Sequence, residues 1–105
     1  MKVRNMQSSR GNDIPNQFII EDATLTVPTF SAIGNNVMIQ PHTGIAFQSY
    51  RSIIAFKTSG NVYLDQNYWN YSVTTGKYRN LFLGESKAET QKKIDSGEYI
   101  LTNLN

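Results

Sequence analysis

The sequence predicts an α+β fold, a small antiparallel β-sheet followed by two short helices packed on one of its faces. Through about residue 65, short runs of β-branched and aromatic residues alternate with turn-forming Gly, Pro, Asn and Ser residues. After residue 72 the apolar residues take a helical spacing, and two helix-start signals follow one another. Strands first and helices afterwards are typical of a layered α+β domain.

Composition favours one folded domain. The chain has 105 residues, of which 39% are hydrophobic and 17% are charged, in the range of ordinary globular proteins. The absence of cysteine excludes a disulfide framework and a thiolate zinc site, and it suits a reducing compartment. No apolar segment approaches the roughly 20 residues that a membrane span needs. We therefore expect a soluble cytoplasmic protein that does not act at a membrane.

The first third of the chain predicts strands interrupted by turns. Residues 7–16 are rich in turn formers, so residues 1–12 are expected to be an arm or an edge strand. Residues 17–21 and 24–27 have the composition and alternation of two strands. Pro28, which has no backbone N–H, places the later part of this segment at an edge or end of the sheet.

The middle of the chain predicts further strands. Residues 37–40 follow a turn signal at 34–36 and are expected to stop at the Pro-His-Thr-Gly sequence of 41–44. Residues 45–57 predict a longer strand region, bent near 49–52. Within it, the apolar run 53–56 favours a central position in the sheet. A hairpin loop at 58–61 then leads into a strand at 62–65.

The last third predicts two helices and a final strand. Ser72 can cap a helix that runs to about Leu83 and ends at Gly84. Its buried face is expected to hold Tyr78, Leu81 and Phe82. A capping-box pattern starts a second helix over about 86–96, which Gly97 ends. Apolar residues at 99–101 and Leu104 predict a last strand or a tail packed on the sheet.

The sequence contains few residues of the kinds that act in catalysis or bind metal ions. His42, the single histidine, lies in a predicted turn without a neighbouring acidic cluster, and Asp65 at a strand end is expected to be a turn or capping group. No nucleophile–base pair, paired carboxylates or phosphate loop is apparent. We therefore expect a non-enzymatic protein that uses no cofactor and no metal ion.

Aromatic and basic residues are the one remaining constellation. Stacking rings beside cations are used by single-strand nucleic-acid binders, and the same residue types form hot spots for protein partners. The alternative to a binding role is a structural one, in which the aromatic rings fill the core, as we expect for Trp69. The candidate partner-binding residues are Arg4, Arg10, Tyr50, Arg51, Tyr68, Tyr71, Lys77 and Arg79.

Net charge is +2, which is a modest value for a nucleic-acid binder. The N-terminal arm is basic, because Lys2, Arg4 and Arg10 precede the first acid, Asp13. In the last third, acidic residues are interspersed with the basic ones, a pattern more typical of a solvated surface. The charges thus favour a protein partner slightly over nucleic acid.

Three segments carry a resemblance to a known family. They are NQFIIE at 16–21, FQSY with SIIA at 47–55, and YWNYSVTTGKYRNLFL at 68–83, whose YS, TT, KYR and FL elements are the most specific. Together they resemble an uncharacterised family of small proteins carried mainly by phages and prophages. Relative to that pattern, residues 23–45 are an insertion between the first strand and the FQSY strand. The resemblance implies a phage-accessory origin and a place of action in the host cytoplasm, and it implies no particular activity.

These observations leave three hypotheses. The first is a phage accessory protein that binds a host protein, for example an anti-defence inhibitor of the anti-CRISPR type; exposed apolar side chains at Val37, Met38 and Ile39 would favour it. The second is a nucleic-acid-binding protein that uses the aromatic and basic residues. The third and weakest is an enzyme. A homodimer through a free sheet edge, at 24–27 or 37–40, is compatible with the first two.

Overall fold

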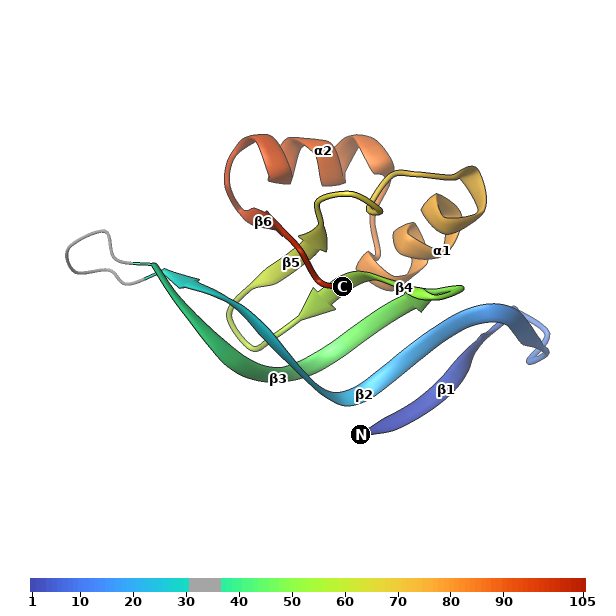
Figure 1. The fold of residues 1–105 in the computed structure, drawn as a ribbon. Helices are drawn as coiled ribbons and strands as arrows, with labels where there is room; N and C mark the ends of the chain where they lie inside the picture. Colours follow the sequence, from blue (N-terminus) through green and yellow to red (C-terminus); the bar gives the residue numbers. More distant parts are fainter. Residues whose placement is uncertain (31–36) are drawn as a thin grey trace.

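A single mixed sheet and two helices make up the computed structural model, which describes residues 1–30 and 37–105 (Figure 1). The sheet order is β1-β2-β3-β4-β5-β6, and all neighbours are antiparallel except β5 and β6. The α+β prediction is confirmed. The last strand returns parallel to β5 because the two helices form the crossover between them. The elements are β1 (Lys2–Gln7), β2 (Asp13–Phe30), β3 (Val37–Ser49), β4 (Ser52–Lys57), β5 (Val62–Asp65), α1 (Val73–Leu83), α2 (Lys87–Asp95) and β6 (Tyr99–Thr102).

Both faces of the sheet bury apolar side chains, because neighbouring strand residues point to opposite faces. Phe47 and Leu64 belong to the cluster under the helices, which also includes Ile54 and the packed side chains of Trp69 and Phe82. Ala46 and Tyr63, which directly precede Phe47 and Leu64, point to the other face. There they join a second cluster with Phe56, Val27 and Leu104. Figure 1 shows α1 and α2 on the same side of the sheet.

The hairpin of β2 and β3 is far longer than the other strands and bends over the second face. At the bend Glu21 and Asp22 oppose the single residue Ile45, and Asp22 has a left-handed φ of 53°. A Cβ atom on Gly44 would lie 2.1 Å from the Lys57 carbonyl oxygen, so only glycine permits this close approach. Beyond the bend, residues 23–30 and 37–44 form what we call the distal hairpin.

The distal hairpin is anchored to the sheet. Val27 is fully buried in the second cluster, which also contains Phe56 and Tyr63. The Tyr63 hydroxyl donates a hydrogen bond to the Pro28 carbonyl oxygen at 2.8 Å. The arrangement corrects the prediction of separate strands at 17–21 and 24–27 and of a strand that stops at Pro41, because pairing continues through both prolines. The turn predicted at 34–36 lies outside the described residues.

A second correction concerns the predicted bend at 49–52, which is a complete reversal of the chain. Ser49 pairs with Ser52, and Tyr50 and Arg51 form the turn, with Tyr50 at a φ of 56°. The central position of β4 and the edge position of β1 are confirmed.

The predicted helices are confirmed, together with their caps. The Ser72 hydroxyl accepts a hydrogen bond from the Thr75 amide, Gly84 is left-handed, and both bonds of the predicted capping box of α2 are present. Of the predicted buried face of α1, Tyr78 and Phe82 pack against the core as expected, but Leu81 is 61% exposed and Arg79 is 1% exposed. No described helix has the length and apolar character needed to cross a membrane.

Candidate functional site

The structure divides the predicted partner-binding residues among separate places. Arg4 lies on edge strand β1, where its Nε atom is 3.3 Å from Glu21 Oε1. Arg10 lies in the turn between β1 and β2, and Tyr50 and Arg51 form the turn between β3 and β4. The other four residues surround the start of α1: Tyr68, Tyr71, Lys77 and Arg79.

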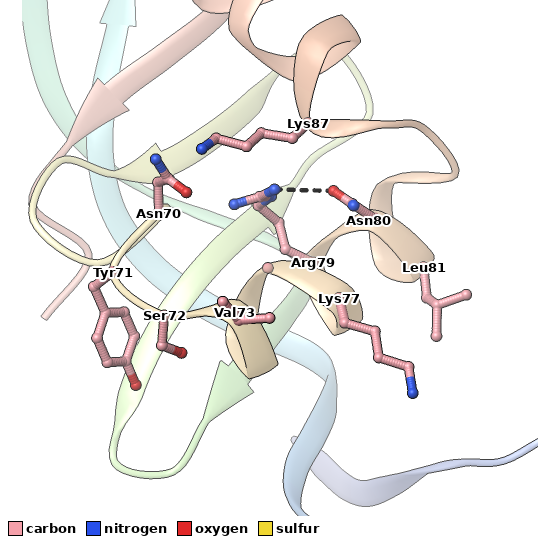
Figure 2. Close-up of a pocket in the computed structure, with 10 residues that line it drawn as sticks. Asn70, Tyr71, Ser72, Val73, Lys77, Arg79, Asn80, Leu81 and Lys87 are labelled. Carbon is pink, nitrogen blue, oxygen red and sulfur yellow. Dashed lines mark hydrogen bonds between the residues drawn. The ribbon is translucent and has the colours of Figure 1, made fainter.

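Three of those four residues line an open groove of about 680 Å³ along α1 (Figure 2). The groove also receives Lys87 from the first turn of α2, a residue that sequence reasoning did not single out. We call it the α1 groove and define it by the residues of its wall: 70–73, 76–77, 79–81 and 87. Tyr68 lies outside this wall and packs edge-on against Tyr71, with ring centroids 5.4 Å apart.

Arg79 is a buried cation, which corrects its predicted place on the surface. Its guanidinium stacks on Trp69, 5.3 Å from the ring centroid, and donates to the Trp69 carbonyl oxygen and, at 2.9 Å, to Asn80 Oδ1. Its Nε atom has no hydrogen-bond partner among the described residues. Burial lowers the pKa of Arg79, and the charge of Glu85 opposes that shift. Trp69 packs against the core, as predicted.

A second exposed feature is the tip of the distal hairpin. Val37, Met38 and Ile39 are 55%, 56% and 64% exposed, although they are adjacent residues of one strand. No Asp, Glu, Lys or Arg occurs from residue 23 to residue 45, although 17% of the whole chain is charged. The absence of charged residues from 23 to 45 is visible in the sequence and could have indicated the exposed apolar tip, but the candidate residues were chosen for their aromatic and basic character.

Asp65 is buried, and its carboxylate is hydrogen-bonded to the backbone and to one side chain. Its carboxylate accepts hydrogen bonds from the backbone amides of Asn67, Tyr68 and Leu104 and from Asn105 Nδ2. The prediction that Asp65 is a turn or capping group is confirmed in its first form, since its carboxylate holds the turn at 66–70. His42 Nε2 and Thr29 Oγ1 share a hydrogen bond across the distal hairpin. Within residues 1–30 and 37–105, no three His, Asp or Glu residues are grouped so that they could hold a metal ion.

Glu85 anchors α2 to the last strand. Its carboxylate accepts hydrogen bonds from Thr90 Oγ1, Lys93 Nζ and the Tyr99 hydroxyl. Burial alone would raise the pKa of Glu85, but these three donors together lower it below the usual value. Burial and the bond to Glu85 raise the pKa of Tyr99 to about 12. The network stabilises the helical layer and leaves none of these groups facing the α1 groove.

The chain belongs to a family of unknown function (DUF8033), whose profile matches residues 1–98. The match spans strands β1 to β5 and both helices, and it ends just before β6. No curated protein and no solved structure matches the chain. Since the family carries no assigned activity, the exposed surfaces are the basis for a functional proposal.

Proposed function

We propose that the protein is a non-enzymatic binding module that attaches to a partner protein through the tip of its distal hairpin. The observation that carries the proposal is the exposure of Val37, Met38 and Ile39, each of which presents more than half of its surface. Because adjacent strand residues point to opposite faces, apolar side chains project from both faces of the tip. Contiguous exposed apolar surface of this kind marks protein interaction sites.

Backbone edges add to the apolar surface. In the described part of the sheet, β1 pairs with β2 only as far as Glu21, and β4 pairs with β3 only from Ile45. Each strand of the distal hairpin therefore has one sheet neighbour and one open edge. Open edges accept a further strand by β-augmentation. The proposed partner is accordingly a protein that offers a strand edge beside an apolar surface.

Charge favours a protein over nucleic acid at the tip. Binding to nucleic acid depends on Lys and Arg side chains that neutralise phosphates. Residues 23–45 contain neither Lys nor Arg. A neutral, apolar surface of this kind suits a protein interface, whose core is depleted of charged residues.

The biological setting is part of the same proposal. The resemblance of 16–21, 47–55 and 68–83 to small phage and prophage proteins supports a phage-accessory origin. The partner would then be a host protein in the host cytoplasm, and an anti-defence inhibitor of the anti-CRISPR type is a specific form of this role.

A nucleic-acid-binding role is the second candidate. It is favoured by the α1 groove, which gathers Tyr71, Lys77 and Arg79 on one wall. The other predicted cations do not extend this surface into a track, since Arg4 pairs with Glu21 and neither Arg10 nor Arg51 lines the groove. Single-strand binders instead use a continuous positive groove along the backbone.

The test of the proposed function compares two single lysine substitutions in the same hairpin. Ile39→Lys places a charge on the apolar tip, whereas Thr26→Lys places the same charge on an exposed polar position. Tagged proteins are incubated with host lysate treated with nuclease, and captured proteins are cross-linked and identified by mass spectrometry. We expect a partner that cross-links to residues 37–39 and is captured by the wild type and Thr26→Lys but not by Ile39→Lys.

Three results would overturn the proposal. Equal capture by both variants would place the contact elsewhere. Loss of all capture on nuclease treatment would favour nucleic acid. A cross-link only to a second copy, with a dimer mass in light scattering, would make the tip a homodimer edge.

A further inference from the structure

We infer that the α1 groove is a second binding site, independent of the hairpin tip, for the phosphate group of a nucleotide. Three cationic side chains line it, Lys77 and Arg79 from α1 and Lys87 from α2. Among the described residues the close ion pairs involve Arg4 and Lys93, so none of the three cations of the groove makes a direct ion pair, although the charge of Glu85 acts on Arg79 over a longer distance. Figure 2 shows the side chains of Arg79 and Lys87 near one another and that of Lys77 pointing away from them, so Arg79 and Lys87 supply the positive charge that favours an anionic ligand.

Arg79 is the strongest indication of a ligand. Burying a charged group is costly unless the group is paired, and Arg79 is 1% exposed while both of its hydrogen-bond acceptors, the Trp69 carbonyl oxygen and Asn80 Oδ1, are neutral. A guanidinium carries five N–H groups in a planar fork. Only two hydrogen bonds from this guanidinium are present in the described structure, to the Trp69 carbonyl oxygen and to Asn80 Oδ1. Its Nε atom has no partner there. Phosphate oxygens are acceptors that match such a fork.

Lys87 brings a second charge to the same point. Figure 2 shows its side chain extending from α2 across the groove toward Asn70 and the guanidinium of Arg79. Two cations that face one another repel unless an anion lies between them. Asn80 can add a neutral donor, because its Oδ1 atom accepts from Arg79 and its Nδ2 group has no hydrogen-bond partner among the described residues. Ammonium, guanidinium and amide donors together form a typical oxyanion site.

The apolar part of the wall indicates what carries the phosphate. Tyr71, Val73 and Leu81 line the same groove and are exposed. An exposed tyrosine ring beside cations can stack on a nucleobase, an interaction that contributes about 1–3 kcal/mol per base in single-strand binders. The ligand class is therefore a nucleoside phosphate, either a free nucleotide or one residue of a nucleic-acid strand.

The test uses the single tryptophan as a reporter. Because Trp69 stacks on Arg79, its indole N–H signal in a ¹⁵N–¹H spectrum should respond to a bound anion. The probes are inorganic phosphate, adenosine 5′-monophosphate and a short oligothymidylate, with adenosine and chloride at matched ionic strength as references. We expect saturable shifts with the phosphate-bearing probes and none with chloride. Tighter binding of the monophosphate would identify a free nucleotide, and tighter binding of the oligonucleotide would identify a strand.

Lys87 carries the mutational part of the test, since it is exposed and its replacement leaves the core intact. Lys87→Gln is expected to weaken monophosphate binding about tenfold, as for the loss of one charge-assisted contact. Lys92→Gln is the matched control, because Lys92 lies on the same helix, is exposed and does not line the groove. Equal effects of the two variants, or shifts in the wild type that chloride reproduces, would overturn the inference. Ile39→Lys should leave phosphate binding unchanged, so failure at the hairpin tip and failure at the groove are distinguishable.

Discussion

In both the helix-covered part of the sheet and the distal hairpin, side chains alternate between two faces. The two regions differ in how far their apolar side chains are buried. Under the helices, Phe47 is fully buried and its ring lies 5.8 Å from that of Phe82. In the described part of the distal hairpin, Ala23 and Val27 are buried, whereas the tip at Val37, Met38 and Ile39 stays exposed.

This difference separates residues that stabilise the fold from residues that remain exposed. The helical layer is fixed by a packed core and by the buried network around Glu85, whose acceptor oxygens are bonded to three side chains. The tip of the hairpin has neither a covering layer in the described structure nor charged residues along its edges. Edges without such protection are rare unless something pairs with them. The contrast predicts large stability effects in the first region and small ones at the tip.

The largest effect is expected at the centre of the core. Phe47→Ala should lower the free energy of unfolding by about 3–5 kcal/mol, because it removes a fully buried ring and leaves a cavity. Met38→Ala, at the tip, should change it by no more than about 0.5 kcal/mol. Chemical denaturation of both variants measures the difference. Similar losses for the two would show that the tip is part of the core.

Arginine substitutions give the next largest contrast. Arg79→Ala should cost about 1.5–3 kcal/mol, because it leaves the Trp69 carbonyl and the Asn80 side chain without their charged donor. Arg51→Ala, in the exposed turn between β3 and β4, should stay within about 0.5 kcal/mol. Urea unfolding curves of the two variants provide the comparison. A neutral Arg79→Ala would mean that the stacked guanidinium serves the groove and not the fold.

Local signals predicted the helical layer well, because caps are encoded by nearby residues. Ser72, Gly84 and the capping box of α2 fix helix ends through contacts within a few residues. The long hairpin was missed because Pro28 and Pro41 have the composition of strand ends. They are accommodated here since each strand of the distal hairpin has an open edge, where a missing N–H leaves no ladder partner unsatisfied.

The candidate site was less accessible from the sequence. Helical periodicity counts apolar residues, so it placed Leu81 inside and Arg79 outside. The actual rotation of α1 depends on contacts outside the helix, namely those of Thr75 with Ser49, of Phe82 with Phe47 and of Arg79 with Trp69. Lys87, in the first turn of α2, joins the groove through the direction that the chain takes at 84–86, which no local pattern specifies. The charge-free run at 23–45, by contrast, was visible in the sequence.

A smaller effect is expected for the buried network at Glu85. Glu85→Gln should cost about 1–2 kcal/mol at pH 7, whereas Glu21→Gln, in the exposed pair with Arg4, should cost less than about 0.5 kcal/mol. Since the folded protein lowers the pKa of Glu85, its contribution is complete above the unfolded value of about 4.3 and is lost as the pH falls through the folded value.

The gap in unfolding free energy between the wild type and Glu85→Gln should therefore narrow from pH 7 to pH 3. Denaturation curves across this range measure it. A gap that stays constant would mean that the charge of Glu85 contributes nothing to folding.

The smallest effect is expected at the tip itself. Ile39→Ala should change the free energy of unfolding by no more than about 0.5 kcal/mol, because the side chain is already 64% exposed. Val27→Ala, in the partner strand of the same hairpin, should cost about 1–2 kcal/mol because its side chain is fully buried against the sheet. Thermal and chemical unfolding measure the loss of stability in each variant. The comparison shows which part of the hairpin contributes to folding. If Ile39→Ala costs as much as Val27→Ala, the apolar tip is needed for folding, and its exposure no longer supports a role in binding a partner.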